Sequence, residues 1–119
     1  MDNKKIGKAA EDRVIEVMQK RGYRLLARNY YVHLAGELDA VMEKGDNIYV
    51  IEVKSRYKGN NSDYDPSLAI DRRKRNNMLK ATRVFVHKNG LYDKNIIFLV
   101  GLVTHSRSGF IHNVEITEF

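Results

Sequence analysis

The chain of 119 residues is predicted to form one α/β domain, residues 1–119, in which helices flank a central sheet. Three observations lead to this fold class. Apolar residues recur at helical spacing near the N-terminus and again after residue 71. A turn at Lys44-Gly45-Asp46-Asn47 joins two strand-like segments. Both segments are apolar on both faces near the turn, which is typical of interior strands that helices cover.

The first element is a helix predicted from about Lys4 to Arg21. Asp2 or Asn3 can cap its start, and Gly22 can end it. One face of this helix is apolar, with Ile6, Ala10, Val14, Val17 and Met18 at helical spacing. Residues 23–33 follow and are rich in aromatic and branched side chains, which predicts a first strand.

The second half of the chain begins with residues 58–66, a polar, turn-forming segment predicted to be a mobile loop beside the site described below. Asp71 is predicted to cap a basic helix whose packing stripe consists of Met78, Thr82, Phe85 and Val86. Residues 95–104 predict a buried strand, and residues 109–119 a final, more polar one. The complete order is α-β-β-β-α-β with one extra strand.

The turn between the second and third strands predicts which residues pair. A two-residue or a four-residue loop pairs residues whose numbers sum to 91. Asp39 would then face Glu52, and Glu37 would face Lys54. Because side chains alternate, these four share a face with Val41, Ile48 and Val50, opposite Leu38, Ala40, Met42, Tyr49, Ile51 and Val53.

Two carboxylates opposite each other in an antiparallel pair have Cβ atoms about 5 Å apart, and their repulsion is roughly 3 kcal/mol at an effective dielectric of about 20. A divalent cation between Asp39 and Glu52 would remove this cost. Carboxylate oxygens without Cys or a nearby His favour Mg²⁺ or Mn²⁺ over zinc. Ordinary strand alternation, with Lys54 neutralising Glu37 at the surface, is the alternative interpretation. Because both strands are apolar on both faces near the turn, their charged residues favour a functional site over this surface interpretation.

Glu11 is a further candidate from the first helix. On a helical wheel it lies at the edge of the apolar stripe, on the same side as Gly7. It can therefore reach toward the sheet, where it could hold a water molecule or extend the ligand set. The alternative is a glutamate at the helix surface.

The net charge of +6 is unevenly distributed. Residues 71–88 contain seven Lys or Arg and one acid, and residues 1–28 contain eight bases and four acids. Residues 29–53 contain one base and five acids. An acidic centre that holds cations, between basic segments that attract phosphates, favours nucleic acid as the partner. A solvated helix face is the alternative for the basic helix.

Composition excludes several other classes of protein. Cysteine is absent, so disulfides and thiolate metal sites are excluded. The N-terminal residues lack the apolar run of a signal peptide, and the longest apolar run, residues 96–103, is far shorter than a membrane span. A soluble, cytoplasmic protein without membrane contact is predicted.

An acid on one strand, a hairpin, and Glu-x-Lys on the next strand resemble the PD-(D/E)XK nuclease superfamily. Asp39 matches the lone acid of its motif, and Glu52 and Lys54 match the acid-x-Lys pair. Nearly the whole chain is similar to the YraN-like branch, which is related in fold to archaeal Holliday junction resolvases. The matching residues are Gly7, Glu11, Arg21-Gly22-Tyr23, Ala27-Arg28-Asn29, Gly36-Glu37-Leu38-Asp39, Glu52-Val53-Lys54-Ser55-Arg56, Lys74 and Phe119.

The resemblance implies a restriction-endonuclease-like core with a mixed central sheet. It also implies a metal-dependent endonuclease that hydrolyses phosphodiester bonds in DNA, with branched or flapped DNA as the expected substrate and a homodimer as the expected assembly. Asp39, Glu52 and the backbone carbonyl of Val53 would hold Mg²⁺ or Mn²⁺. Glu11 or Glu37 would complete or support this shell.

The basic residues have predicted roles in the same reaction. Lys54 would orient the nucleophile or stabilise the pentavalent phosphate. Arg56 and Lys74 would grip flanking phosphates, and Arg72, Arg73 and Arg75 beside Lys74 would add nucleic-acid contacts. A non-catalytic nucleic-acid binding module on the same fold is the main alternative function. A protein-interaction domain, without affinity for DNA, is the third.

Overall fold

A computed structural model describes residues 2–59 and 70–119. Its elements are α1 (Asn3–Lys20), β1 (Arg24–Val32), β2 (Gly36–Lys44), β3 (Asn47–Tyr57), α2 (Arg72–Asn89), β4 (Asn95–His105) and β5 (Ile111–Glu118). The strands form one sheet in the order β1-β2-β3-β4-β5. Only β3 and β4 are parallel, so the sheet is mixed. The predicted α/β fold class is confirmed. The predicted loop at residues 58–66 lies, from residue 60 onward, outside the described residues.

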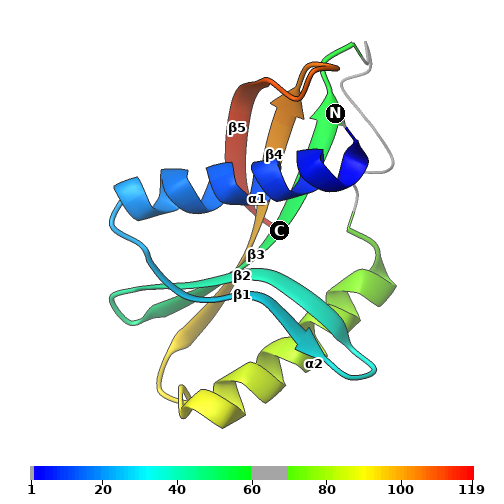
Figure 1. Cartoon of the computed structure of the whole chain (residues 1–119). Coiled ribbons are helices and arrows are strands. Elements are labelled where there is room, and N and C mark those ends of the chain that lie inside the picture. The colour runs from blue at the N-terminus through cyan, green and yellow to red at the C-terminus, as the bar shows by residue number, and fades with distance from the viewer. Residues whose placement is uncertain (1, 60–69) are drawn as a thin grey trace.

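The two helices cover opposite faces of the sheet (Figure 1). α1 packs through Ile6, Ala10, Val14, Ile15 and Met18, so the predicted stripe is correct except that Ile15 is buried more deeply than Val17. α2 packs through Met78, Ala81, Thr82 and Phe85. Each helix has its own apolar cluster against the sheet, and these two clusters form the core.

Capping fixes where both helices begin. The Asp2 side chain accepts a hydrogen bond of 2.8 Å from the backbone N–H of Lys5, and Asp71 accepts an equivalent bond of 2.8 Å from Lys74. The Asp71 cap was predicted from the sequence, and Asp2 is the one of the two predicted candidates, Asp2 and Asn3, that caps α1. α2 ends at Gly90, whose φ of 63° is a left-handed conformation that glycine adopts without strain.

The hairpin between β2 and β3 has the predicted register. Its pairs run from Lys44 and Asn47 to Ala40 and Ile51, and every pair of numbers sums to 91. The loop is the two-residue alternative. Its first residue, Gly45, has a φ of 60°.

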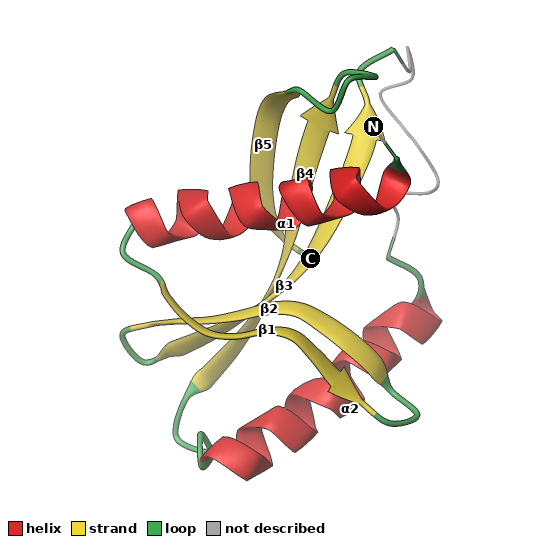
Figure 2. Cartoon of the chain, viewed as in Figure 1, coloured by secondary structure: helices red, strands yellow, loops and turns green. Residues whose placement is uncertain are grey.

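Beyond Ala40 and Ile51 the sheet forks. No further pair joins β2 to β3, although β2 continues beside β1 to Gly36 and β3 continues beside β4 to Tyr57. Figure 2 shows the start of β2 and the end of β3 diverging on the side where both helices have their N-termini. The fork is the opening between these two strand segments.

The fork overturns three details of the predicted hairpin. Asp39 is not paired with Glu52 in the ladder, because the pairing of β2 with β3 stops at Ala40 and Ile51. Glu37 does not face Lys54, because Glu37 pairs with Tyr31 of β1 and lies on the other arm of the fork. Leu38 does not share the apolar cluster of Ala40, since it packs with Val41 against α2. The regular alternation of side chains is broken at Asp39, because Leu38 and Ala40 on either side of it face different clusters.

A close approach of α1 to β4 depends on Gly101. A Cβ atom there would lie 2.9 Å from both Cγ atoms of Val14, which is fully buried. We expect Gly101→Ala to lower the free energy of unfolding by about 1–3 kcal/mol, as overpacked cores do. Urea denaturation measures this change. Adding Val14→Ala should recover part of the loss, and equal midpoints for Gly101→Ala and the wild type would contradict the prediction.

The helices of the described residues do not combine the length and apolar character needed to cross a membrane.

Candidate active site

Asp39 and Glu52 lie at the base of the fork, on its two arms. In place of a partner on β2, the backbone N–H of Val53 donates a hydrogen bond of 2.8 Å to Asp39 Oδ2. This bond holds the Asp39 carboxylate against β3, next to Glu52. The Glu52 residue is only 6% exposed, and its Oε2 atom has no hydrogen-bond partner among the described residues.

Two lysines approach Glu52 from different elements. The Nζ atom of Lys54 lies 4.0 Å from Glu52 Oε1, and the Nζ atom of Lys74 in α2 lies 3.4 Å from Oε2. The second distance allows an ion pair, but the geometry does not give a hydrogen bond to Oε2. The carboxylate is therefore balanced by charge, while one of its oxygens has no hydrogen-bond donor within residues 2–59 and 70–119.

The surroundings disfavour ionised carboxylates in this pair. Burial, and next the charge of Glu52, raise the pKa of Asp39 from its ordinary value of 3.8 to about 7, while the Val53 hydrogen bond opposes the shift. Burial also raises the pKa of Glu52, against the opposing charges of Lys74 and Lys54. Perturbed acids that lie together in this way are typical of functional sites.

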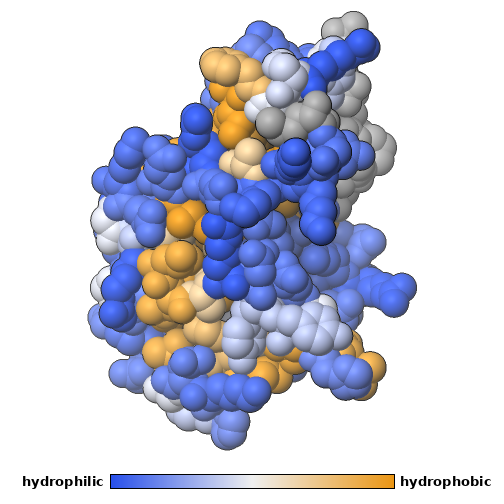
Figure 3. Space-filling model, in the orientation of Figure 1, coloured by the Kyte–Doolittle hydropathy of each residue, from blue (hydrophilic) through white to orange (hydrophobic). Residues whose placement is uncertain are grey.

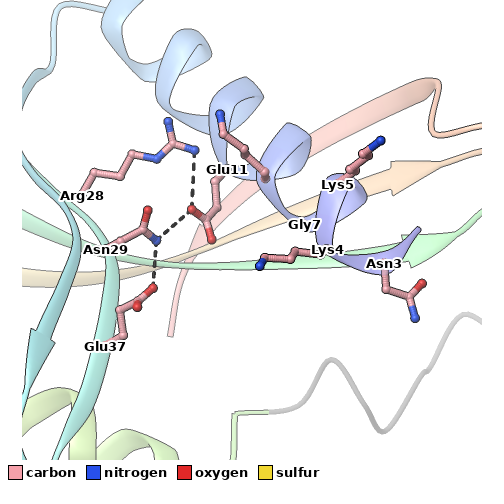
Figure 4. A pocket seen from close by; sticks show the side chains of 9 residues that line it. Asn3, Lys4, Lys5, Gly7, Glu11, Arg28, Asn29 and Glu37 are labelled. Atoms are coloured by element: carbon pink, nitrogen blue, oxygen red, sulfur yellow. Dashed lines mark hydrogen bonds and ion pairs between the residues drawn. The ribbon is translucent and has the colours of Figure 1, made fainter. Parts of the chain in front are cut away.

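Asn29 connects two further acids and was not among the predicted site residues. Its side-chain nitrogen donates hydrogen bonds of 3.0 Å to Glu11 and 2.8 Å to Glu37 (Figure 4). The neighbouring pairs of β1 and β2 place Asn29 opposite Asp39. Its φ is 51°, a left-handed conformation that asparagine tolerates better than most residues. In the sequence, Asn29 stood out only within the Ala27-Arg28-Asn29 match to the YraN-like family, and no role was assigned to it.

Glu11 reaches from α1 toward the sheet, as the helical wheel predicted. Its charge contributes to the raised pKa values of both Asp39 and Glu52, so it lies within electrostatic reach of the pair. Arg28 of β1 has one guanidinium nitrogen 3.6 Å from Glu11 Oε1 and another 2.6 Å from Asp12. Four acidic side chains therefore surround the base of the fork.

The conformation of Asn29 gives a prediction about stability. Asn29→Gly keeps the left-handed backbone but loses both hydrogen bonds to carboxylates, which should cost about 0.5–1.5 kcal/mol at this exposed position. Asn29→Ala should cost about 1 kcal/mol more, because alanine is strained at positive φ. Urea unfolding of the three proteins measures the order. An alanine variant as stable as the glycine variant would contradict it.

The basic residues predicted to bind nucleic acid do not all gather at the fork. Lys74 does, through its contact with Glu52. Arg72 and Arg73 are exposed in the first turn of α2. Arg56 donates from Nε to Thr104 Oγ1 at 3.3 Å, which directs it toward β4.

Arg75 is directed away from the acids. Its Nε donates to the backbone oxygen of Ile70 at 3.1 Å, and its guanidinium lies 5.6 Å from the ring centre of Phe119. Arg75 therefore contacts the C-terminal end of the chain. Of the five residues predicted to bind nucleic acid, Arg72 and Arg73 alone form no such side-chain contact within residues 2–59 and 70–119.

The donors at the fork fit a hard divalent cation that also uses water and substrate oxygens. No three His, Cys, Asp or Glu side chains within residues 2–59 and 70–119 form a group able to hold a metal ion by themselves. Mg²⁺ typically needs only one or two carboxylates, because waters and phosphate oxygens complete its shell. The unpartnered Oε2 of Glu52 and the raised pKa of Asp39 are both features that a bound cation would relieve.

Comparison with known proteins gives a family. The family model described as "Uncharacterised protein family UPF0102" matches residues 10–105, a stretch that contains the fork. A UPF0102 protein of Dictyoglomus thermophilum is 39% identical over 116 residues, which cover 97% of this chain and 95% of that protein. UPF0102 proteins of Fusobacterium nucleatum and Carboxydothermus hydrogenoformans are 37% and 33% identical, over 82% and 77% of this chain and 80% and 75% of theirs.

Proposed function

Because the chain belongs to the uncharacterised protein family UPF0102, the YraN-like family that its motifs resemble, we propose that the fork is a nuclease site. The protein would be a Mg²⁺- or Mn²⁺-dependent endonuclease that hydrolyses phosphodiester bonds in branched or flapped DNA. The observation that supports this most is the pair of half-buried Asp39 and buried Glu52, with the amines of Lys54 and Lys74 beside Glu52.

Asp39, Glu52 and the Val53 carbonyl would hold the cation. When bound, it supplies positive charge to the attacked phosphate and lowers the pKa of a water molecule. Asn29 keeps Glu11 and Glu37 together at the edge of this set, where they can support a ligand or a water.

The two lysines act on the phosphate in this proposal. Lys54, 4.0 Å from Glu52, orients the nucleophile or stabilises the pentavalent phosphate. Lys74 balances Glu52 in the structure. A cation bound to Glu52 would leave the Lys74 amine available to a phosphate oxygen, as a point charge suited to that contact. Arg72 and Arg73 would bind phosphates further along the strand.

Cleavage assays separate this function from the alternative, a non-catalytic binding module. The nuclease should cut branched or flapped DNA in Mg²⁺ or Mn²⁺ and leave it intact in EDTA. The binding module should bind DNA equally in both conditions and cut it in neither. Anomalous density between Asp39 and Glu52 in a crystal soaked with Mn²⁺ would support the nuclease independently. A homodimer is part of the proposal on the resemblance alone, and light scattering tests it.

A further inference from the structure

We propose that a basic hollow beside Gly7 of α1 is a second nucleic-acid contact, which holds the sugar-phosphate backbone of the strand adjoining the cleaved bond. The inference rests on the proposed function for the position of that bond. The ligand, a chain of phosphodiesters, is inferred chiefly from the lysines of α1, to which no individual role has been assigned above.

The hollow lies between α1 and the first two strands and has a volume of about 780 Å³. Its α1 wall contains four cationic or small residues, Lys4, Lys5, Gly7 and Lys8, and its β1 wall contains Arg28 and Asn29. The acids Glu11 and Glu37 line its edge on the side of the fork. Figure 4 shows these side chains bordering the same space as the contacts from Asn29 to Glu11 and Glu37. The hollow thus adjoins the acidic site through residues that belong to both. A strand leaving the fork on the α1 side would enter it.

The charge of the α1 wall favours an anionic ligand. Within the described part of the chain, Lys4 and Lys5 form no ion pair, and Lys8 lies 3.4 Å from Asp12. The first turn of α1 contains no acid. Cations at a helix N-terminus are unfavourable, because the macrodipole is positive there. A bound phosphate would interact favourably both with the lysines and with the positive end of the helix dipole. The surface over α1 is mainly hydrophilic, as a contact for a phosphate backbone requires (Figure 3).

Gly7 is a second and independent observation. Glycine inside a helix lowers stability relative to alanine, and it is usually explained by close packing. Here a Cβ atom would meet nothing within 4 Å. No neighbour in the described parts of the chain therefore requires glycine, and the effect of glycine is to leave the backbone of α1 open to the hollow. A ligand that approaches the helix backbone closely would explain why glycine stands at this position, whereas packing does not.

Binding of flapped DNA in EDTA tests the proposal without cleavage. The triple variant Lys4→Gln, Lys5→Gln and Lys8→Gln removes three charges from the hollow. Its matched control, Lys20→Gln, Lys80→Gln and Lys88→Gln, removes three exposed charges away from the hollow: one in the last turn of α1, and two in the middle and last turn of α2 on the other face of the sheet. We expect the hollow variant to lose about 10-fold or more in affinity and to reduce the slope of log K against log [salt] by about 2, since each phosphate contact contributes roughly 0.7–0.9. The control should change the slope by less than about 0.5.

Gly7→Leu tests the shape of the hollow with no change of charge. We expect it to melt at the same temperature as the wild type or a few degrees higher, and to bind DNA about 10-fold more weakly. Gln19→Leu, at an exposed position near the other end of α1, should leave binding unchanged. Wild-type affinity in Gly7→Leu, or equal salt slopes for the two triple variants, would overturn the proposal.

The outcomes distinguish this inference from the proposed function. A protein that binds DNA through the hollow but never cuts it in Mg²⁺ or Mn²⁺ would overturn the nuclease and retain the contact. A protein that cuts DNA, while its salt dependence is the same in both triple variants, would overturn the contact alone. Absence of DNA binding would overturn both.

Discussion

Asp39→Asn is expected to lower Mg²⁺-dependent cleavage of branched or flapped DNA by at least about 10³-fold, or about 4 kcal/mol in the activation free energy. Asparagine keeps an oxygen that can accept the hydrogen bond from Val53 N–H, so the fork should retain its shape. What is lost is the negative charge that would hold the cation. Initial rates of cleavage of a labelled flap substrate measure the effect.

Glu52→Gln should have a similar effect, because it removes the charge from the other arm of the fork. Both variants should bind DNA in EDTA at least as well as the wild type, since each removes a negative charge near the phosphates. Glu16→Gln is the matched control, as Glu16 is exposed on α1 and pairs only with Lys20. Persistent cleavage by both the Asp39 and the Glu52 variant would end the nuclease proposal.

In the absence of divalent cations, Asp39 is expected to make the protein less stable as the pH rises from about 4 to about 7. The folded protein raises the pKa of Asp39 from 3.8 to about 7, so over this range the folded state binds a proton that the unfolded chain has lost. The proton count then makes the free energy of unfolding fall with pH. Below pH 4 the contribution is absent, and above pH 7 it is constant.

The full shift would correspond to about 4 kcal/mol, and solvent at the half-buried Asp39 should reduce the measured value to about 2–4 kcal/mol. The quantity to measure is the difference between the wild type and Asp39→Asn, since other titrating groups largely cancel. At pH 8 in EDTA the variant should melt on the order of 10 °C higher. At pH 4 the two proteins should melt together.

Divalent cations should reverse this difference. Mn²⁺ at millimolar concentration binds the folded wild type and should raise its melting temperature at pH 8, but should leave Asp39→Asn nearly unchanged. The cation competes with the proton on Asp39, so the shift should be much smaller at pH 5. Equal melting curves for the two proteins in EDTA at all pH values would contradict the raised pKa of Asp39 in the folded protein.

The elements and the hairpin register were predictable because their signals are local. Asp2 and Asp71 cap the helices that they were predicted to cap. The turn at Gly45 fixed the pairing of β2 with β3 as far as Ala40 and Ile51. Each of these features depends on a few residues close together in the chain, where spacing and turn chemistry decide the structure.

The fork was not predictable in this way, because alternation assumes that paired strands stay together. Leu38 and Glu37 were assigned to the wrong neighbours for this reason. The position of Lys74 beside Glu52 also required the folded chain, since 21 residues separate the two and the intervening segment carries no pairing signal. The acid pair and its supporting residues Glu11, Glu37 and Lys54 were named from the sequence. The link through Asn29 and the contact of Lys74 with Glu52 came from the structure.

The parallel pairing of β3 and β4 determines which element supplies the positively charged side chain beside Glu52. A chain that joins two adjacent parallel strands must cross one face of the sheet, and α2 makes this crossing. Such a helix starts near the carboxyl end of the strand that precedes it, which here carries Glu52 and Lys54. The topology of the sheet therefore places the first turn of α2 near Asp39 and Glu52. A homologue with arginine in place of Lys74 would still supply the counter-charge to Glu52 from the same turn.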